Sequence, residues 1–159
     1  MKPEQPRLYS EFASWFHLLT APASYAEEAE FALKVLTESS SKIESVLELG
    51  AGGGNNAFHL KKHFAMTLTD LSPSMLDQSR GINPECDHLE GDMRSIRLGR
   101  EFDGVFVHVA ISYLTTKEDM MACMKTAFVH CKRGGVVLFM PDFVRERFRP
   151  GMHHGGHDG

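Results

Sequence analysis

A cluster of glycines directly after an apolar segment constrains this chain more than any other feature. Residues 46–56 read VLELGAGGGNN. The apolar start of this segment is typical of a strand buried in a parallel sheet, and an amphipathic segment that looks helical follows the glycines. A strand, a glycine turn and a helix start therefore succeed one another without spare residues. This arrangement predicts a turn whose backbone can approach a ligand closely.

Length and composition favour a single cytoplasmic domain. The chain has 159 residues, which is enough for one hydrophobic core and too few for two ordinary domains. Its net charge of -4 argues against a general nucleic-acid or membrane-surface binder. No segment resembles a signal peptide or approaches membrane-spanning length. Cys86, Cys123 and Cys131 lack CxxC spacing, so we interpret them as reduced, mostly buried thiols.

Two helices are predicted before the first strand, and residues 1–43 would form a helical cover over the core. The first helix carries an apolar stripe and ends at Pro22. This stripe consists of Phe12, Trp15, Phe16 and Leu19. The second helix begins at Ser24, because Ser24 and Glu27 have the spacing of a capping box.

After the glycine turn, predicted helices alternate with predicted strands. The later strands are expected at 66–71, 87–90, 102–109 and 136–140. Helices are expected at 56–64, after the cap formed by Ser72, and from Thr116 until the Gly134-Gly135 pair ends the third. We interpret one face of this third helix as core, namely Met120, Met124, Ala127, Phe128 and Cys131. The alternation predicts an α/β fold, a doubly wound and mostly parallel sheet, over residues 44–143.

The predicted sheet is truncated after its fifth strand. Residues 144–159 consist of a basic extension and a tail that we expect to be flexible. An apolar last strand with a free edge is an aggregation hazard. We therefore expect this edge to be covered by the extension, by a homo-oligomer or another chain, or by a missing C-terminal segment.

Acidic residues mark the ends of the first three predicted strands, where open α/β sheets bind their ligands. They are Glu48, Asp70 and Asp92. Asp70 follows Gly50 by 20 residues, a distance at which a carboxylate can accept hydrogen bonds from ribose hydroxyls. A dinucleotide site shares this feature. However, Asn55 stands where the dinucleotide fingerprint requires glycine or alanine, and Glu48 suits a cationic ligand better than a pyrophosphate.

Five segments occur in an order and spacing that identify a family. Residues 48–54 read ELGAGGG, residues 70–76 read DLSPSML, residues 91–94 read GDMR, residues 102–105 read FDGV, and residues 132–135 read KRGG. Together they resemble the motifs of the class I S-adenosylmethionine-dependent methyltransferases. The resemblance covers about residues 8–143. Its helical preface at residues 24–29 looks most like small-molecule N- and O-methyltransferases, including those that act on amino sugars.

This resemblance implies a Rossmann-like sheet with S-adenosyl-L-methionine as the cofactor. The backbone of the glycine turn, with Gly50, Ala51, Gly52 and Gly54, would pass beneath the methionine part of the cofactor. Glu48 would lie near the ammonium group of that part, directly or through water.

The next two motifs would hold the nucleoside. The resemblance implies that Asp70 holds the ribose hydroxyls, while Leu71 and Met75 flank the adenine. Asp92 would accept a hydrogen bond from the adenine amino group, and the Met93 backbone would lie beside it.

His108 would border the reactive sulfonium and the methyl acceptor, and Tyr9 and Tyr25 would cover the cofactor. Methyl transfer chiefly requires that an acceptor lone pair be aligned with the sulfonium methyl group where water is excluded. A base helps only if the acceptor is a hydroxyl or a protonated amine. His108 and Tyr113 are the candidates for this base, and the sequence does not choose between them.

The main hypothesis is a methyltransferase that acts on an amine or hydroxyl of a small molecule. A non-catalytic or truncated S-adenosylmethionine-binding module, which needs further segments or a partner chain, is the first alternative. An NAD-dependent Rossmann enzyme is the second. We expect no metal site, and we interpret His59 and His63 as part of a solvated helix face rather than as a metal pair.

Overall fold

The structure, a computed structural model, describes residues 6–39 and 42–151. Within these residues the centre is a parallel sheet of five strands in the order β3-β2-β1-β4-β5. The strands are β1 (Ser45–Leu49), β2 (Ala65–Asp70), β3 (Asp87–Glu90), β4 (Phe102–Val107) and β5 (Cys131–Phe139). The chain moves outward from β1 to β3 and then crosses to β4, so the strand order reverses beside β1. The predicted doubly wound parallel sheet is therefore confirmed.

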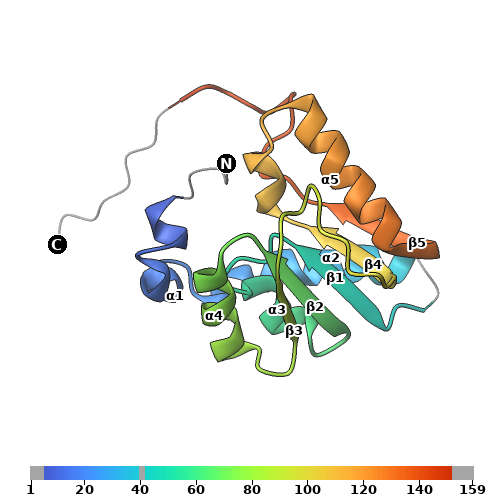
Figure 1. The fold of residues 1–159 in the computed structure, drawn as a ribbon, viewed down its shortest axis with the longest axis horizontal. Helices are drawn as coiled ribbons and strands as arrows, with labels where there is room; N and C mark the ends of the chain where they lie inside the picture. Colours follow the sequence, from blue (N-terminus) through green and yellow to red (C-terminus); the bar gives the residue numbers. More distant parts are fainter. Residues whose placement is uncertain (1–5, 40–41, 152–159) are drawn as a thin grey trace.

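Helices cover both faces of this sheet. They are α2 (Ala26–Ser39), α3 (Asn55–Leu60), α4 (Pro73–Ile82) and α5 (Lys117–His130). Successive side chains of β1 point to opposite faces, so Val46 packs in one core with residues of α2 and α3, and Leu47 packs in a second core with residues of α5. Burial on both sides explains the continuous apolar run of this strand. Figure 1 shows α5 along β4 and β5, at the opposite end of the molecule from α1 and α4.

The first predicted helix is wrong in form and orientation. The chain before α2 instead makes short turns, namely η1 (Arg7–Tyr9), η2 (Ala13–Trp15), α1 (Phe16–Leu19) and η3 (Pro22–Tyr25). Trp15 and Leu19 of the expected apolar stripe are 61% and 64% exposed. Polar contacts decide the orientation of this segment, because His17 Nε2 lies 2.9 Å from the Gly53 carbonyl oxygen and the Thr20 carbonyl accepts a hydrogen bond from Asn55 Nδ2 at 3.0 Å.

The second helix is correctly predicted, but its start is not. Ser24 lies inside η3 and not at a helix cap, and α2 begins at Ala26. The proposed capping box with Glu27 is therefore wrong. Proline at the first position of η3 favours this tight turn and moves the helix start two residues along the chain.

The glycine turn between β1 and α3 requires glycine at three positions. Gly50, Gly52 and Gly54 have φ angles of 72°, 53° and 77°, in the left-handed region that other residues rarely adopt. The amides of Gly50 and Ala51 both donate to the Thr69 carbonyl of β2 at 2.9 Å, which ties the turn to the neighbouring strand. The helix that follows ends at Leu60 and is shorter than the predicted 56–64.

The region around β5 departs furthest from the expected pattern. The Gly134-Gly135 pair does not end α5, which stops at His130, but lies inside β5. The register of β5 against β4 shifts there, and a Cβ atom at Gly135 would lie 2.6 Å from the Asp103 carbonyl oxygen. The two glycines therefore allow a bulge where the strands approach closely.

The prediction that one face of α5 is core is partly wrong. Ala127 is buried, but Met124 and Phe128 are 45% and 77% exposed. No described strand pairs with the outer edge of β5, and the described part of the basic extension contains no strand. Coverage of this edge stays a prediction, and the tail from residue 152 onward lies outside the described residues. Among those described, no helix has the length and apolar character needed to cross a membrane.

Candidate functional site

A cavity of about 640 Å³ lies at the carboxyl ends of the strands. Glu48 of β1 and Asp70 of β2 line it, together with Asp92, which follows β3, and His108, which follows β4. The order of the strands therefore places these four side chains along one edge of the sheet. This is the edge at which open α/β sheets bind ligands, next to the point where the strand order reverses.

The structure gathers nearly all of the predicted site residues around this cavity. Those that line it are Tyr9, Tyr25, Glu48, Gly50, Ala51, Gly52, Asp70, Leu71, Met75, Asp92, Met93, His108 and Tyr113. Gly54 does not line it. A Cβ atom at Gly54 would lie 2.1 Å from Ser79 Oγ and 2.4 Å from Asn83 Nδ2, so this glycine serves the close packing of the turn against α4.

Asp70 fixes the glycine turn from the end of β2. Its Oδ2 accepts a hydrogen bond from the Gly52 amide at 2.8 Å, and its Oδ1 accepts one from the Ser72 amide at 2.9 Å. A carboxylate has about four acceptor positions, and the Leu71 amide also interacts with this group, so acceptor capacity remains for a ligand. Burial raises the pKa of this carboxyl group, and the backbone amides that it accepts from oppose that rise.

Glu48 is a buried acid without a described partner for one oxygen. Its side chain is only 2% exposed, and its Oε2 makes no hydrogen bond to any described residue. Burial and the nearby charge of Asp70 raise the pKa of Glu48 to about 8. The Oδ1 atoms of Asn55 and Asn56, which also line the cavity, are equally buried and without a partner among the described residues. Three buried acceptors without a described partner therefore belong to residues that line the cavity, and such acceptors favour a ligand that carries hydrogen-bond donors.

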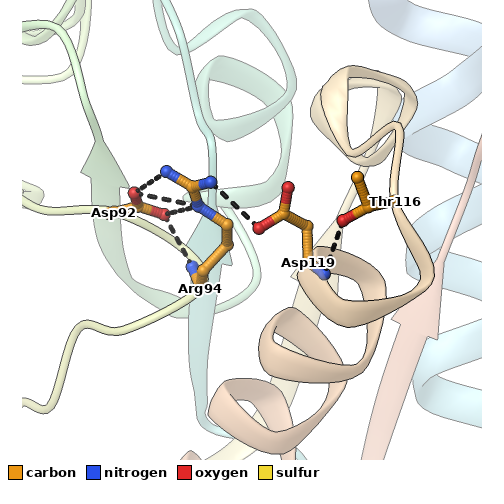
Figure 2. A network of polar contacts seen from close by, with 4 residues as sticks. All are labelled: Asp92, Arg94, Thr116 and Asp119. Atoms are coloured by element: carbon orange, nitrogen blue, oxygen red, sulfur yellow. Dashed lines mark hydrogen bonds and ion pairs between the residues drawn. The ribbon is translucent and has the colours of Figure 1, made fainter. Parts of the chain in front are cut away.

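Asp92 is held by an arginine two residues along the chain. Arg94 Nε lies 3.0 Å from both carboxylate oxygens, Arg94 Nη2 lies 2.6 Å from Oδ2, and the Arg94 amide donates to Oδ1 at 2.8 Å. These bonds lower the pKa of Asp92. Arg94 Nη1 also donates to Asp119 near the start of α5 at 3.0 Å, as Figure 2 shows.

His108 forms a pair with Glu28 of α2. Its Nε2 lies 3.2 Å from Glu28 Oε2, and the rings of Tyr25 and Phe106 pack around it. Burial lowers the pKa of His108, although the negative charges of Glu28 and Asp142 oppose this shift. A neutral imidazole that donates through Nε2 keeps its Nδ1 free to accept a proton.

The N-terminal turns close the other side of the cavity. The Tyr9 hydroxyl lies 2.6 Å from the Tyr113 hydroxyl, and the Tyr9 carbonyl accepts a hydrogen bond from Ser72 Oγ. Burial and the hydrogen bond with Tyr113 raise the pKa of Tyr9. Tyr113 is thus bonded to another hydroxyl and is 55% exposed, so His108 is the better placed of the two predicted base candidates.

Sequence reasoning missed several residues of the cavity. These are Phe16, Thr20, Glu28, Asn55, Asn56, Arg94, Asp119 and Asp142. Four of them lie in segments that the sequence singled out, because Arg94 belongs to GDMR, Asn55 and Asn56 end the segment 46–56, and Glu28 lies in the helical preface. The others come from helices and loops whose approach to the cavity depends on the folded arrangement. The predicted solvated position of His59 is also incomplete, since its Nε2 lies 2.8 Å from the Pro22 carbonyl oxygen.

The fold and this site are those of the class I S-adenosylmethionine-dependent methyltransferase family. The model of a family described as "Methyltransferase domain" matches residues 46–135, more than half of the chain, so the chain belongs to that family. The predicted resemblance is thereby confirmed, and the match includes the glycine turn, Asp70, Asp92 and His108.

Two curated relatives carry names that describe them as N,N-dimethyltransferases of amino sugars. The chain is 33% identical over 129 residues to dTDP-3-amino-3,4,6-trideoxy-alpha-D-glucopyranose N,N-dimethyltransferase of Streptomyces venezuelae, covering 80% of this chain and 54% of the relative. It is 31% identical to dTDP-3-amino-3,6-dideoxy-alpha-D-glucopyranose N,N-dimethyltransferase of Streptomyces fradiae, covering 80% and 51%.

Solved structures give the same picture of the fold. Streptomyces venezuelae DesVI superposes with a TM-score of 0.79 at 29% identity, over 94% of this chain and 63% of that one. S-adenosylmethionine-bound CalS10, an amino pentose methyltransferase from Micromonospora echinaspora, superposes with a TM-score of 0.77 at 25% identity, over 96% and 63%. The chain thus spans about half the length of the curated relatives that it matches.

Proposed function

We propose that this chain binds S-adenosylmethionine and takes part in methyl transfer to the amino group of a small molecule, with amino sugars as the class to test first. The observation that carries this proposal is the row of polar groups along one cavity, from Asp92 through Asp70 and Glu48 to His108. Membership of the methyltransferase family and the names of the amino-sugar relatives support it.

The residues of the cavity fit this cofactor. Asp70 keeps acceptor capacity for ribose hydroxyls beside the backbone amides that it accepts from. An ammonium group carries three donors and a positive charge, which are the properties that the buried acceptors of Glu48, Asn55 and Asn56 require. The glycine turn carries no side chain at Gly50, Gly52 and Gly53, which line the cavity, so its backbone can lie close to the methionine part.

At the other end of the cavity, His108 and Glu28 favour an amine over a hydroxyl as the acceptor. A protonated amine is attracted by the carboxylates of Glu28 and Asp142, which both act on His108. His108 Nδ1 then takes a proton from the ammonium, and the amine gains the lone pair that it needs as a nucleophile. The bound cofactor supplies an electrophilic methyl group on a positively charged sulfur. Tyr25, whose ring packs against His108, would shield this end of the cavity from water.

Isothermal titration with S-adenosylhomocysteine and NAD tests the cofactor. We expect micromolar binding of S-adenosylhomocysteine and none of NAD, and the reverse result would favour a nicotinamide enzyme. Incubation with S-adenosylmethionine and a matched panel of amino sugars and their hydroxyl counterparts tests the acceptor. Methylation of the hydroxyl compounds alone would contradict an amine acceptor.

A second candidate is a cofactor-binding module that completes its acceptor pocket with further residues or a partner chain. The outer edge of β5, with which no strand in the described part of the chain pairs, favours this candidate, as do the exposed Met124 and Phe128 of α5. Binding of S-adenosylhomocysteine without turnover across the whole panel would support it.

We also infer a cytoplasmic location, which the absence of CxxC spacing supports and cell fractionation would test.

A further inference from the structure

Arg94 is the single lysine or arginine among the described residues that line the cavity. Its guanidinium group is shared by two carboxylates on opposite sides, those of Asp92 and Asp119 (Figure 2). The side chain is only 30% exposed, and those of its partners are 23% and 33% exposed. Arg94 therefore orients Asp92, which lines the cavity, and connects Asp92 to helix α5 through Asp119.

Asp92 is fixed in place by its own loop as well as by Arg94. The amides of Ser95 and Ile96 donate to the Asp92 carbonyl at 2.9 and 2.8 Å, which folds residues 92–96 into a tight turn. A Cβ atom at Gly91 would lie 2.2 Å from Ile96 Cδ1, so this turn packs directly beneath the start of the loop. The backbone of the loop is therefore set before any ligand binds.

The hydrogen bonds from Arg94 leave the Asp92 carboxylate able to accept a further hydrogen bond but not to donate one. Its Oδ1 accepts from the Arg94 amide and shares the Nε donor, while Oδ2 accepts from Nη2 and shares the same Nε. A carboxylate has about four acceptor positions, and the three donors of Arg94 occupy about three of them, so the group retains room for one further donor. Because the group is bound by a cation, it stays a pure acceptor and does not carry a proton that it could donate.

This arrangement distinguishes purines by their 6-substituent. The 6-amino group of adenine donates to such a carboxylate, whereas the 6-oxo group of hypoxanthine is an acceptor and would face it unpaired. An unpaired acceptor in a partly buried site is rejected strongly.

We propose that Arg94 is the positioning and specificity-determining residue of the adenine subsite, which holds Asp92 as an obligate acceptor for the adenine 6-amino group and couples it to helix α5 through Asp119. This inference rests on the proposed function, since it assumes that the cavity binds the cofactor.

The chain offers a matched control in Arg97. This residue belongs to the same loop and also reaches α5, because its Nη1 donates to Thr126 Oγ1 at 2.7 Å and to the Ile96 carbonyl at 2.7 Å. It does not line the cavity. Arg94→Gln and Arg97→Gln therefore each remove one positive charge and one contact between loop and helix, but only the first alters the environment of Asp92.

The test is isothermal titration of the unaltered protein and both variants with S-adenosylhomocysteine and with its 6-oxo counterpart, S-inosylhomocysteine. We expect the unaltered protein and Arg97→Gln to prefer the adenine ligand by at least about 30-fold. In Arg94→Gln this preference should fall to about threefold or less, mostly through weaker binding of the adenine ligand. Asp92→Asn, whose amide can donate, should shift the preference toward the 6-oxo ligand.

A preference in Arg94→Gln equal to that of the unaltered protein would overturn the inference, as would equal losses for both ligands. If Arg94→Gln does not fold, Arg94→Lys is measured in its place, because lysine keeps the charge but cannot form the two-pronged contact. An unchanged preference in that variant would again overturn the inference. If the unaltered protein binds neither ligand, the proposed function fails and the inference fails with it, whereas adenine binding with an unaltered preference refutes the role of Arg94 alone.

Discussion

Glu48 should release a proton when the cofactor binds. Its pKa in the free protein is raised from an ordinary value of 4.5 to about 8, chiefly by burial and secondarily by Asp70. Below about pH 8 the side chain is therefore protonated in the free protein. An ammonium group placed against Oε2 favours the carboxylate and returns the pKa toward its ordinary value. Binding near pH 6.5 should then release about one proton per ligand.

The linkage also fixes how affinity and stability depend on pH. With pKa values of about 8 in the free protein and about 4.5 in the complex, the affinity should rise roughly 70-fold between about pH 5.5 and pH 7.5. The stability of the free protein changes with pH in the opposite direction. An acid whose folded pKa is raised contributes stability that is complete below its unfolded pKa of 4.5 and is lost as the pH rises to about 8. That loss is on the order of 5 kcal/mol.

Isothermal titration of S-adenosylhomocysteine in phosphate and imidazole buffers near pH 6.5 measures the proton release, because the two buffers differ in ionisation enthalpy. Glu48→Gln removes the titrating group and should bring the release close to zero. Glu44→Gln, on the exposed side chain that pairs with Lys42, is the matched control and should leave it unchanged. Equal heats in both buffers for the unaltered protein, or an undiminished release in Glu48→Gln, would refute this reasoning.

Three further substitutions have definite expected outcomes. Asp70→Asn should weaken binding of S-adenosylhomocysteine by about 10- to 100-fold in a titration, and an unchanged affinity would place the ribose elsewhere. Glu28→Gln removes a charge that raises the pKa of His108, so the acid limb of the pH profile of kcat/KM should move to lower pH; an unmoved limb would exclude His108 as the base. Gly54→Ala should cost about 2–4 kcal/mol in urea unfolding, whereas Gly81→Ala, in open space on α4, should stabilise by about 0.5–1 kcal/mol. Similar effects for the two glycines would contradict the packing argument.

The fold and the cofactor half of the site were readable from the sequence for physical reasons. Strands buried on both faces are continuous apolar runs, so β1 and β4 stand out in the sequence. In a parallel sheet their ends meet at one edge, so the ends of β1 to β3 brought Glu48, Asp70 and Asp92 together as expected. The left-handed φ angles of the glycine turn likewise leave a direct signature, because few other residues adopt them.

The N-terminal segment was misread because its orientation does not follow apolar periodicity. An amphipathic stripe predicts which side of a helix is buried only when that helix packs by its apolar face. Here His17 and Thr20 bind the glycine turn and Asn55, while Trp15 remains exposed. The same limit applied to α5, where periodicity assigned Phe128 to the core.

The sequence by itself determined the class of fold, the glycine turn and the three acids at the strand ends, since these depend on local patterns and on one rule of sheet geometry. Only the tertiary structure decided which side chains pair across the cavity. Glu28 meets His108, and Arg94 lies between Asp92 and Asp119, because helices from distant parts of the chain approach the same edge of the sheet. Such pairs fix protonation and orientation in the site, and no periodicity or motif spacing records them.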